Sequence, residues 1–279
     1  MDATTLLISM ASMGGLGAVF SAGLAIANKK LYVEEDPRIG ELNEWLPGAN
    51  CGGCGFAGCS NFAEKVVLGE AEVSGCPVCN DEAREEMARI MGIEAQAGEK
   101  LVARILCQGG DYETAKKGLY FGAQSCTAVS LSGGGEKMCS YGCLGYGECV
   151  EACPFDALHM DANGIPVVDP ENCTGCGNCE EACPRGVIEM HPVSDKIFVA
   201  CRNQDGPKES RKLCLKACVG CSICIRALAD NEMTIENNLA RIDYGKYGQG
   251  NELPTEKCPT GCLIVIESEP AVATTPAEA

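Results

Sequence analysis

The longest apolar stretch of the chain lies near its N-terminal end. Residues 4–27 carry no charged side chain and are mostly apolar. Because about 20 such residues suffice for a helix to cross a bilayer, we expect one membrane-spanning helix here. Asp2 precedes the stretch, whereas Lys29 and Lys30 follow it. This charge asymmetry predicts that the rest of the chain lies in the cytoplasm, with the anchor in the cytoplasmic (inner) membrane.

Two further features of this stretch affect its interpretation. Its acidic start argues against a cleaved signal peptide, which begins with basic residues. Small residues recur every four positions, as at Gly14, Ala18 and Ala22. This spacing allows close packing of one membrane helix on another, so we expect membrane-bound partner subunits.

The rest of the chain shows shorter and weaker patterns. Helices are predicted at 61–72 and 81–91, and the apolar run 102–106 is typical of a strand. From 137 to 266 the chain is dense in cysteine, and we expect short strands and turns there. The tail 267–279 consists of Pro, Ala, Thr, Glu and a few other residues, and is predicted to be disordered.

Cysteine usage changes this picture most. The chain has 279 residues and 22 cysteines, but only 5% of its residues are aromatic. A chain so poor in large apolar side chains needs another source of stability. A disulfide framework and metal ligation are the two candidates. Metal ligation is favoured because the cysteines fall in tight runs with two-residue gaps, as ligands of one centre do.

The strongest motif is the run C-x2-C-x2-C-x3-C-P that ends at Pro184. This spacing is typical of bacterial ferredoxins, in which three cysteines hold one [4Fe–4S] cluster and the fourth reaches the neighbouring cluster. Proline after the fourth cysteine fixes φ and turns the chain away. A zinc site would need only four convergent ligands. The run consists of Cys173, Cys176, Cys179 and Cys183.

A second group completes the interleaved pair. The sequence Glu-Ala-Cys-Pro occurs at both 151–154 and 181–184. Tyr146 stands where the usual run has a cysteine, and Cys139 is expected to take its place. One cluster is therefore assigned to Cys139, Cys143, Cys149 and Cys183, and the other to Cys153, Cys173, Cys176 and Cys179.

A repeat with a period of 75 residues predicts a second ferredoxin-like module at 196–266. It maps Cys126 to Cys201 and Cys139 to Cys214, and it maps later cysteines of the first module to cysteines of the second in the same way. Four cysteines of the first module have non-cysteine counterparts, so the second module is expected to hold one cluster. These counterparts are Leu228, Gly248, Asn251 and Pro254. The expected ligands are Cys218, Cys221, Cys224 and Cys258, with Cys214 as a competitor of Cys221.

The N-terminal cysteine group has its own spacing, C-x2-C-x4-C, followed after 16 residues by a fourth cysteine. The loop is rich in glycine and suits one [4Fe–4S] cluster, with zinc as the alternative. These ligands are Cys51, Cys54, Cys59 and Cys76. The four sets predict about four clusters and leave unassigned Cys79, Cys107, Cys126, Cys201, Cys214 and Cys262, for which buried thiols, a cysteine pair or an extra cluster are possible.

Net charge limits the possible partners. The formal charge is −17 and the isoelectric point is about 4.6, which disfavours nucleic acid. No dinucleotide or flavin fingerprint appears, and the glycines at 133–135 lack the Lys-Ser/Thr of a phosphate loop. The chain alone is therefore not expected to reduce NAD+. Basic residues nevertheless lie around the cysteine motif of the second module, at Lys208, Arg211, Lys212, Lys216 and Arg226.

The order of these motifs resembles a known family. An apolar helix, the sequence G-A-N-C-G-G-C-G-F-A-G-C at 48–59, C-S-Y-G-C-L-G-Y-G-E-C at 139–149 and tandem ferredoxin motifs are together similar to the RnfB family, the B subunits of the Rnf electron-transport complex. The resemblance implies an electron-carrying component of a membrane complex that couples electron flow from reduced ferredoxin to NAD+ with Na+ or H+ transport. Soluble ferredoxin and other membrane subunits would be its partners.

The expected fold is α+β. We predict a transmembrane anchor at 1–33, a small [4Fe–4S] domain at 34–97 and a connecting segment at 98–136. These are followed by a two-cluster ferredoxin-like module at 137–195, a degenerate one-cluster module at 196–266 and a disordered tail at 267–279. Two other functions fit the same motifs. One is a reductase subunit that keeps a redox-sensing transcription factor reduced, and the other is a relay subunit of another membrane dehydrogenase or hydrogenase.

Overall fold

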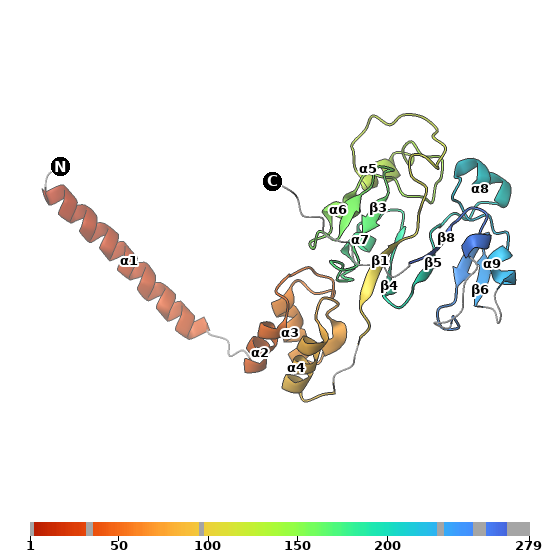
Figure 1. Cartoon of the computed structure of the whole chain (residues 1–279). Coiled ribbons are helices and arrows are strands. Elements are labelled where there is room, and N and C mark those ends of the chain that lie inside the picture. Colours follow the sequence, from red (N-terminus) through yellow and green to blue (C-terminus); the bar gives the residue numbers. More distant parts are fainter. Residues whose placement is uncertain (1–2, 32–35, 95–97, 228–231, 248–254, 267–279) are drawn as a thin grey trace, which may run out of the picture.

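The computed structural model describes residues 3–31, 36–94, 98–227, 232–247 and 255–266. Figure 1 shows the first helix apart from the rest, then a small helical domain, and then two units built from short strands. The predicted tail lies outside the described residues. So do the four non-cysteine counterparts predicted in the second module, at Leu228, Gly248, Asn251 and Pro254.

The first helix, α1 (Ala3–Leu31), confirms the helix predicted from the apolar stretch. Its segment Met10–Lys30 is long and apolar enough to cross a membrane, and none of it is buried against the rest of the chain. Lys29 and Lys30 lie in its last turn. An apolar helix this exposed needs a lipid or protein environment to cover it.

The helical domain consists of α2 (Pro37–Trp45), α3 (Cys59–Val67), the 3-10 turn η1 (Val73–Gly75) and α4 (Asp81–Met91). Asp36 caps α2 and Asn80 caps α4 through side-chain bonds to backbone N–H groups. Leu42, Phe62 and Met87 form the centre of the domain's own apolar core.

One predicted helix has different bounds. The helix expected at 61–72 begins at Cys59 and ends at Val67. It ends there because Gly69 adopts a left-handed conformation, φ 74°, and the next two N–H groups turn back to the carbonyl of Lys65. The helix predicted at 81–91 is confirmed as α4.

The first of the two strand-containing units spans 101–192. Its outer pair joins the two ends of the unit in antiparallel register, with Ala103 opposite Met190. The inner pair is a hairpin, and short helices precede and follow it. The elements are β1 (Leu101–Ile105), α5 (Cys126–Leu131), α6 (Glu148–Glu151), β2 (Leu158–Met160), β3 (Pro166–Val168), α7 (Asn178–Glu181) and β4 (Ile188–Pro192).

The strand predicted at 102–106 is confirmed as β1, and its place in the fold is informative. It lies within the segment 98–136, which was expected only to connect two domains, yet it pairs along its whole length with β4. Val102 and Ala103 are buried in the core of the first unit. The first unit therefore begins near residue 101.

The second unit spans 197–265 and repeats this arrangement. Its outer strands pair with Phe198 opposite Ile264, and its inner strands form a hairpin. Its elements are β5 (Ile197–Val199), α8 (Pro207–Leu213), α9 (Ile223–Arg226), β6 (Met233–Glu236), β7 (Leu239–Ile242), η2 (Thr255–Lys257) and β8 (Leu263–Val265).

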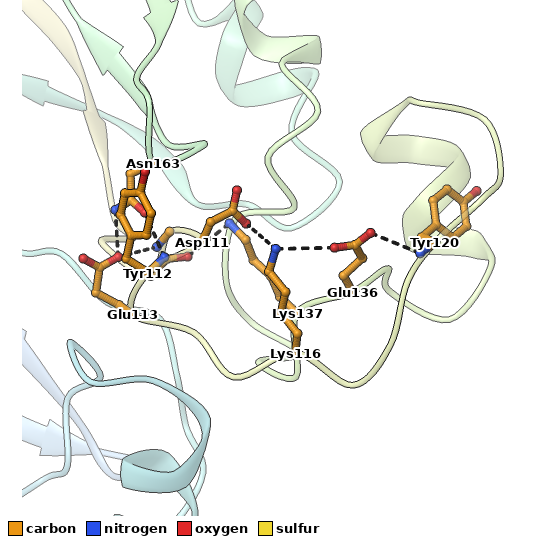
Figure 2. A network of polar contacts seen from close by, with 10 residues as sticks. Asp111, Tyr112, Glu113, Lys116, Tyr120, Glu136, Lys137 and Asn163 are labelled. Carbon is orange, nitrogen blue, oxygen red and sulfur yellow. Dashed lines mark hydrogen bonds and ion pairs between the residues drawn. The ribbon is translucent and has the colours of Figure 1, made fainter.

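Polar contacts fix the long segment between β1 and α6 to the first unit (Figure 2). The Lys116 ammonium lies 3.2 Å from a carboxylate oxygen of Asp111 and 3.5 Å from one of Glu136. The other Glu136 oxygen accepts a hydrogen bond from the Tyr120 N–H over 3.1 Å. Asn163 donates to Glu113 over 2.7 Å. These bonds position a segment that carries four cysteines, namely Cys107, Cys126, Cys139 and Cys143.

Candidate metal centres

All 22 cysteines are free thiols in the structure. Most of them line small cavities in the two units. Among the described residues, no three His, Cys, Asp or Glu side chains are close enough to hold a single metal ion. Four sulfurs around one zinc would lie about 3.8 Å apart, from a Zn–S distance of about 2.3 Å. The thiols of the described residues do not form such a tetrahedral group.

One cavity belongs to the ferredoxin run. Cys153, Cys173, Cys176 and Cys179 all line it, within an empty volume of about 260 Å³. Backbone N–H groups point at two of the sulfurs: that of Ala103 lies 3.5 Å from Cys173 Sγ, and that of Ala157 lies 3.4 Å from Cys153 Sγ. Apolar side chains complete the walls, namely Phe155, Ala157, Leu158 and Met190.

The neighbouring cavity corrects the grouping predicted from the sequence. Cys143, Cys149 and Cys183 line it, in an empty volume of about 350 Å³, but its fourth cysteine is Cys126. Cys139 lies in a different cavity. Cys126 therefore takes the place that the motif spacing gave to Cys139.

A capping interaction explains the presence of Cys126. The helix α5 begins at Cys126, and the Glu148 carboxylate of α6 accepts hydrogen bonds from the Thr127 N–H over 3.1 Å and from the Ser125 hydroxyl. These bonds hold the start of α5 against α6, which carries Cys149. Because the contact joins residues 21 and 23 positions apart, no local spacing signals it.

Burial shapes the chemistry of this cavity. It raises the pKa of the Cys143 thiol to about 12 and that of Cys149 to about 11. A neutral thiol is a poor metal ligand, but bound cations outweigh such a shift and deprotonate a coordinating thiol. The donor set therefore suits a group that brings its own positive charge to the sulfurs.

The second unit has a cavity of about 400 Å³ lined by five cysteines. Cys221 lines it and Cys214 does not. Cys262 is an addition, and its Sγ lies 3.6 Å from that of Cys258. The five are Cys218, Cys221, Cys224, Cys258 and Cys262.

The N-terminal cysteines gather around the helical domain. Cys54 and Cys59 pack against the core that includes Cys76 and Cys79. The Asn50 side chain accepts a hydrogen bond from the Cys59 N–H over 2.9 Å, which closes the glycine-rich loop that holds Cys51. Cys79 hydrogen-bonds Cys76 and lowers its pKa to about 6.

This loop lies directly on the first unit. The Asn178 side chain donates to the Cys51 carbonyl over 3.0 Å. The approach at Gly53 is so close that an added Cβ would lie 2.5 Å from the Cys176 carbonyl oxygen. Cys51 and Cys176, which belong to two different cysteine groups, therefore lie on either side of one contact.

Two regions of the chain match known families. Residues 46–78 match a family described as a putative Fe-S cluster, and residues 138–187 match a 4Fe-4S dicluster domain. With 22 cysteines, these matches show a protein that holds several [4Fe–4S] clusters.

Whole-chain relatives are named more specifically. The chain is 42% identical to the B subunit of the Na(+)-translocating ferredoxin:NAD(+) oxidoreductase complex of Acetobacterium woodii, over 92% of this chain and 77% of the relative. It is 38% identical to the B subunit of the proton-translocating complex of Clostridium ljungdahlii, over 95% and 94% of the two chains. The B subunit of the ion-translocating oxidoreductase complex of Methanosarcina acetivorans is also 38% identical, over 87% and 92%. The chain therefore belongs to the RnfB family, the B subunits of the ion-translocating ferredoxin:NAD(+) oxidoreductase complexes.

Proposed function

We propose that this chain accepts electrons from reduced soluble ferredoxin and relays them to the membrane subunits of a ferredoxin:NAD+ oxidoreductase complex. The observation that carries this proposal is the contact between Cys51 of the helical domain and the first unit. It places the cysteine group nearest the anchor beside the ferredoxin run. NAD+ chemistry belongs to another subunit, since this chain has no nucleotide fingerprint.

Four cysteine sets would hold the clusters. When bound, a [4Fe–4S] cluster takes up and releases one electron at a time. In the second unit Cys221 is preferred to Cys214, and Cys262 is a neighbour of the set. The proposed sets are Cys51, Cys54, Cys59 and Cys76; Cys126, Cys143, Cys149 and Cys183; Cys153, Cys173, Cys176 and Cys179; and Cys218, Cys221, Cys224 and Cys258.

The protein around these sulfurs would set their redox properties. Backbone N–H groups that donate to sulfur stabilise the more negative state and raise the potential. Apolar walls exclude water from the sites. In the second unit, Val199, Met233 and Leu263 supply such walls. This environment favours electron transfer over ligand exchange or hydrolysis.

Residues 196–266 are proposed as a second ferredoxin-like module with one cluster. The order and pairing of β5, β6, β7 and β8 repeat those of β1, β2, β3 and β4. Among the described residues of this unit, the cavity lined by Cys218, Cys221, Cys224 and Cys258 fits one cluster and the loss of the other. This unit lies at the end of the row of domains opposite α1 (Figure 1), so it is the proposed electron acceptor.

A basic helix supports docking of ferredoxin at this end. Lys208, Arg211 and Lys212 lie on α8 and are exposed. Soluble ferredoxins are usually acidic, and a chain of net charge −17 would repel them unless a local basic surface receives them. The surface of α8 that carries these three residues, here called the α8 basic surface, provides it.

The opposite end of the chain would deliver electrons to the membrane. The helical domain directly follows α1, and α1 is apolar enough to cross a bilayer. Lys29 and Lys30 at its end favour a cytoplasmic position for all of the cysteine sites. Small residues along α1 would pack against helices of the other subunits.

Complementation of membranes tests the proposed function. Inverted vesicles from a strain that lacks this chain should show no NAD+ reduction by reduced ferredoxin, and the intact chain should restore it. A Cys176→Ser variant that still inserts in the membrane should restore little. Normal activity without the chain, or full restoration by the variant, would show that electrons take another route.

A further inference from the structure

Four cysteines outside the proposed sets line a cavity between the two units. They come from four separate segments: Cys107 follows β1, Cys139 precedes α6, Cys201 follows β5 and Cys214 follows α8. The empty volume is about 350 Å³, equal to that of the cavity lined by Cys126, Cys143, Cys149 and Cys183. Three of the four were unassigned by motif spacing, and Cys139 was assigned elsewhere.

The sulfurs of this cavity are surrounded by N–H donors, as in the ferredoxin run. The Cys107 Sγ accepts from the Cys143 N–H over 3.3 Å. The Cys201 Sγ accepts from two N–H groups, those of Cys218 over 3.3 Å and Asn203 over 3.4 Å. The Asn203 side-chain nitrogen lies 3.8 Å from the Cys139 Sγ. Such donors stabilise sulfur that carries negative charge.

Two polar side chains in the wall also point to a bound group. Thr114 is 6% exposed, and its hydroxyl has no hydrogen-bond partner among the described residues. Lys137 is also 6% exposed. Among the described residues, its ammonium donates a hydrogen bond only to the Gly109 carbonyl, over 3.2 Å. A buried hydroxyl is costly without a hydrogen-bond acceptor, and a buried ammonium is costly without an anionic group beside it. Four thiolates around iron and sulfide form such a group.

Glycines leave room at this site. A Cβ at Gly142 would lie 3.4 Å from the Cys139 Sγ and 3.5 Å from the Cys107 Sγ. A Cβ at Gly109 would lie 3.0 Å from the Cys214 Sγ and 2.7 Å from the Thr114 hydroxyl. A side chain at Gly109 would therefore press on the Cys214 sulfur, and one at Gly142 would come into contact with the Cys139 and Cys107 sulfurs.

We propose that Cys107, Cys139, Cys201 and Cys214 hold a fifth [4Fe–4S] cluster, which joins the two units. The single-ion alternative is disfavoured because these thiols are not close enough to share one ion. With four thiolates the bound cluster would carry net negative charge, which would balance the buried Lys137 ammonium, and its sulfurs would accept a hydrogen bond from the Thr114 hydroxyl.

The position of this site gives it a second role, which rests on the proposed function. Cys107 accepts its hydrogen bond from Cys143, which belongs to a set in the first unit. Cys201 accepts from Cys218, which belongs to the set in the second unit. The site thus lies between the two, one hydrogen bond from each. When one electron leaves the second unit, that unit would be oxidised by one electron and this site would be reduced by one electron. A second transfer would pass the electron on to the first unit. No covalent bond would form or break in either transfer.

Iron and acid-labile sulfide counts on the anaerobically purified full chain test the site directly. Five sets predict about 20 iron atoms per chain, whereas four sets predict about 16, at four per cluster. A Cys214→Ala variant should lose about four iron atoms, while the control Gly40→Ala, where an added Cβ meets nothing within 4 Å, should lose none. A wild-type count near 16, one zinc ion per chain, or a Cys214→Ala count near 20 would overturn the proposal.

Rapid mixing with reduced ferredoxin tests the bridging role separately. In the Cys214→Ala variant the second unit should still be reduced, and the fast reduction of the first unit should be lost. Equal rates in the variant and the wild type would overturn the bridging role. If the wild-type chain itself were not reduced, the proposed function would fail, but the iron counts would still decide the site.

Discussion

The side-chain amide of Asn178 donates a hydrogen bond to the carbonyl oxygen of Cys51 over 3.0 Å, across 127 residues of sequence. Asn178 begins α7 between two cysteines of the ferredoxin run, and Cys51 begins the N-terminal cysteine group. The contact therefore joins the helical domain to the first unit at their cysteine loops. We expect electron transfer between the two sites to depend on this contact.

A side chain at Gly53 should disturb that contact. A Cβ there would lie 2.5 Å from the Cys176 carbonyl oxygen and 2.9 Å from the Cys176 Cβ, so the loops must separate. Gly53→Ala should keep its iron but slow reduction of the N-terminal site, followed by freeze-quench EPR. Gly40→Ala is the matched control, because a Cβ there meets nothing within 4 Å. Identical kinetics in both variants would mean that electrons do not cross at this contact.

Charge reversal on the α8 basic surface should slow docking. The change of Lys208, Arg211 and Lys212 to Glu should lower the rate of reduction by ferredoxin about tenfold at low ionic strength, because electrostatic steering is worth about 10- to 1000-fold in rate. The difference should shrink as salt rises. The control reverses three charges in the helical domain: Arg38, Lys65 and Arg89.

An unchanged rate in the α8 variant at low salt would place ferredoxin docking elsewhere on the chain. A comparable fall in the control variant would show only a dependence on net charge. Neither outcome would alter the four cysteine sets proposed in the two units and the helical domain, because α8 contributes no ligand to any of them.

Removal of iron should affect the domains unequally. The described residues of the two units form two-stranded sheets, which are marginal alone, and cysteines are a large part of their cores. The helical domain has a core of its own around Leu42, Phe62 and Met87. Circular dichroism of chelator-treated protein should therefore lose the strand signal and its cooperative transition, while helix persists. Cooperative unfolding of the strands in iron-free protein would contradict this.

The membrane topology is also testable. Lys29 and Lys30 at the end of α1 predict that all of the cysteine sites lie in the cytoplasm. Protease added to sealed right-side-out vesicles should leave residues after α1 intact, and detergent should make them accessible. Digestion in the sealed vesicles would reverse the proposed orientation.

The sequence predicted those features that depend on local spacing. The helices α1 and α4 and the strand β1 follow from short patterns. The C-x2-C-x2-C run brought Cys173, Cys176 and Cys179 together, because two-residue gaps leave little freedom to the chain. The pairing of β1 with β4 was missed, since it joins segments more than 80 residues apart.

The sites that the sequence missed depend on contacts across the fold. Cys126 lines one cavity with Cys149, and the Glu148 carboxylate holds the start of α5 beside it. Cys139 was assigned by its place in a repeat, but it lines one cavity with Cys201 and Cys214 of the second unit. The available signal was the number of unassigned cysteines. Six remained, and five of them line cysteine cavities, namely Cys107, Cys126, Cys201, Cys214 and Cys262.

Reduction of the purified chain by stoichiometric reduced ferredoxin, quenched by freezing within milliseconds and recorded by EPR, tests the relay function most directly. Ferredoxin should lose its own signal while signals of the chain's [4Fe–4S] clusters grow, those of the second unit first and that of the N-terminal site last. A chain that dithionite reduces fully but ferredoxin leaves oxidised on this timescale would contradict the relay function.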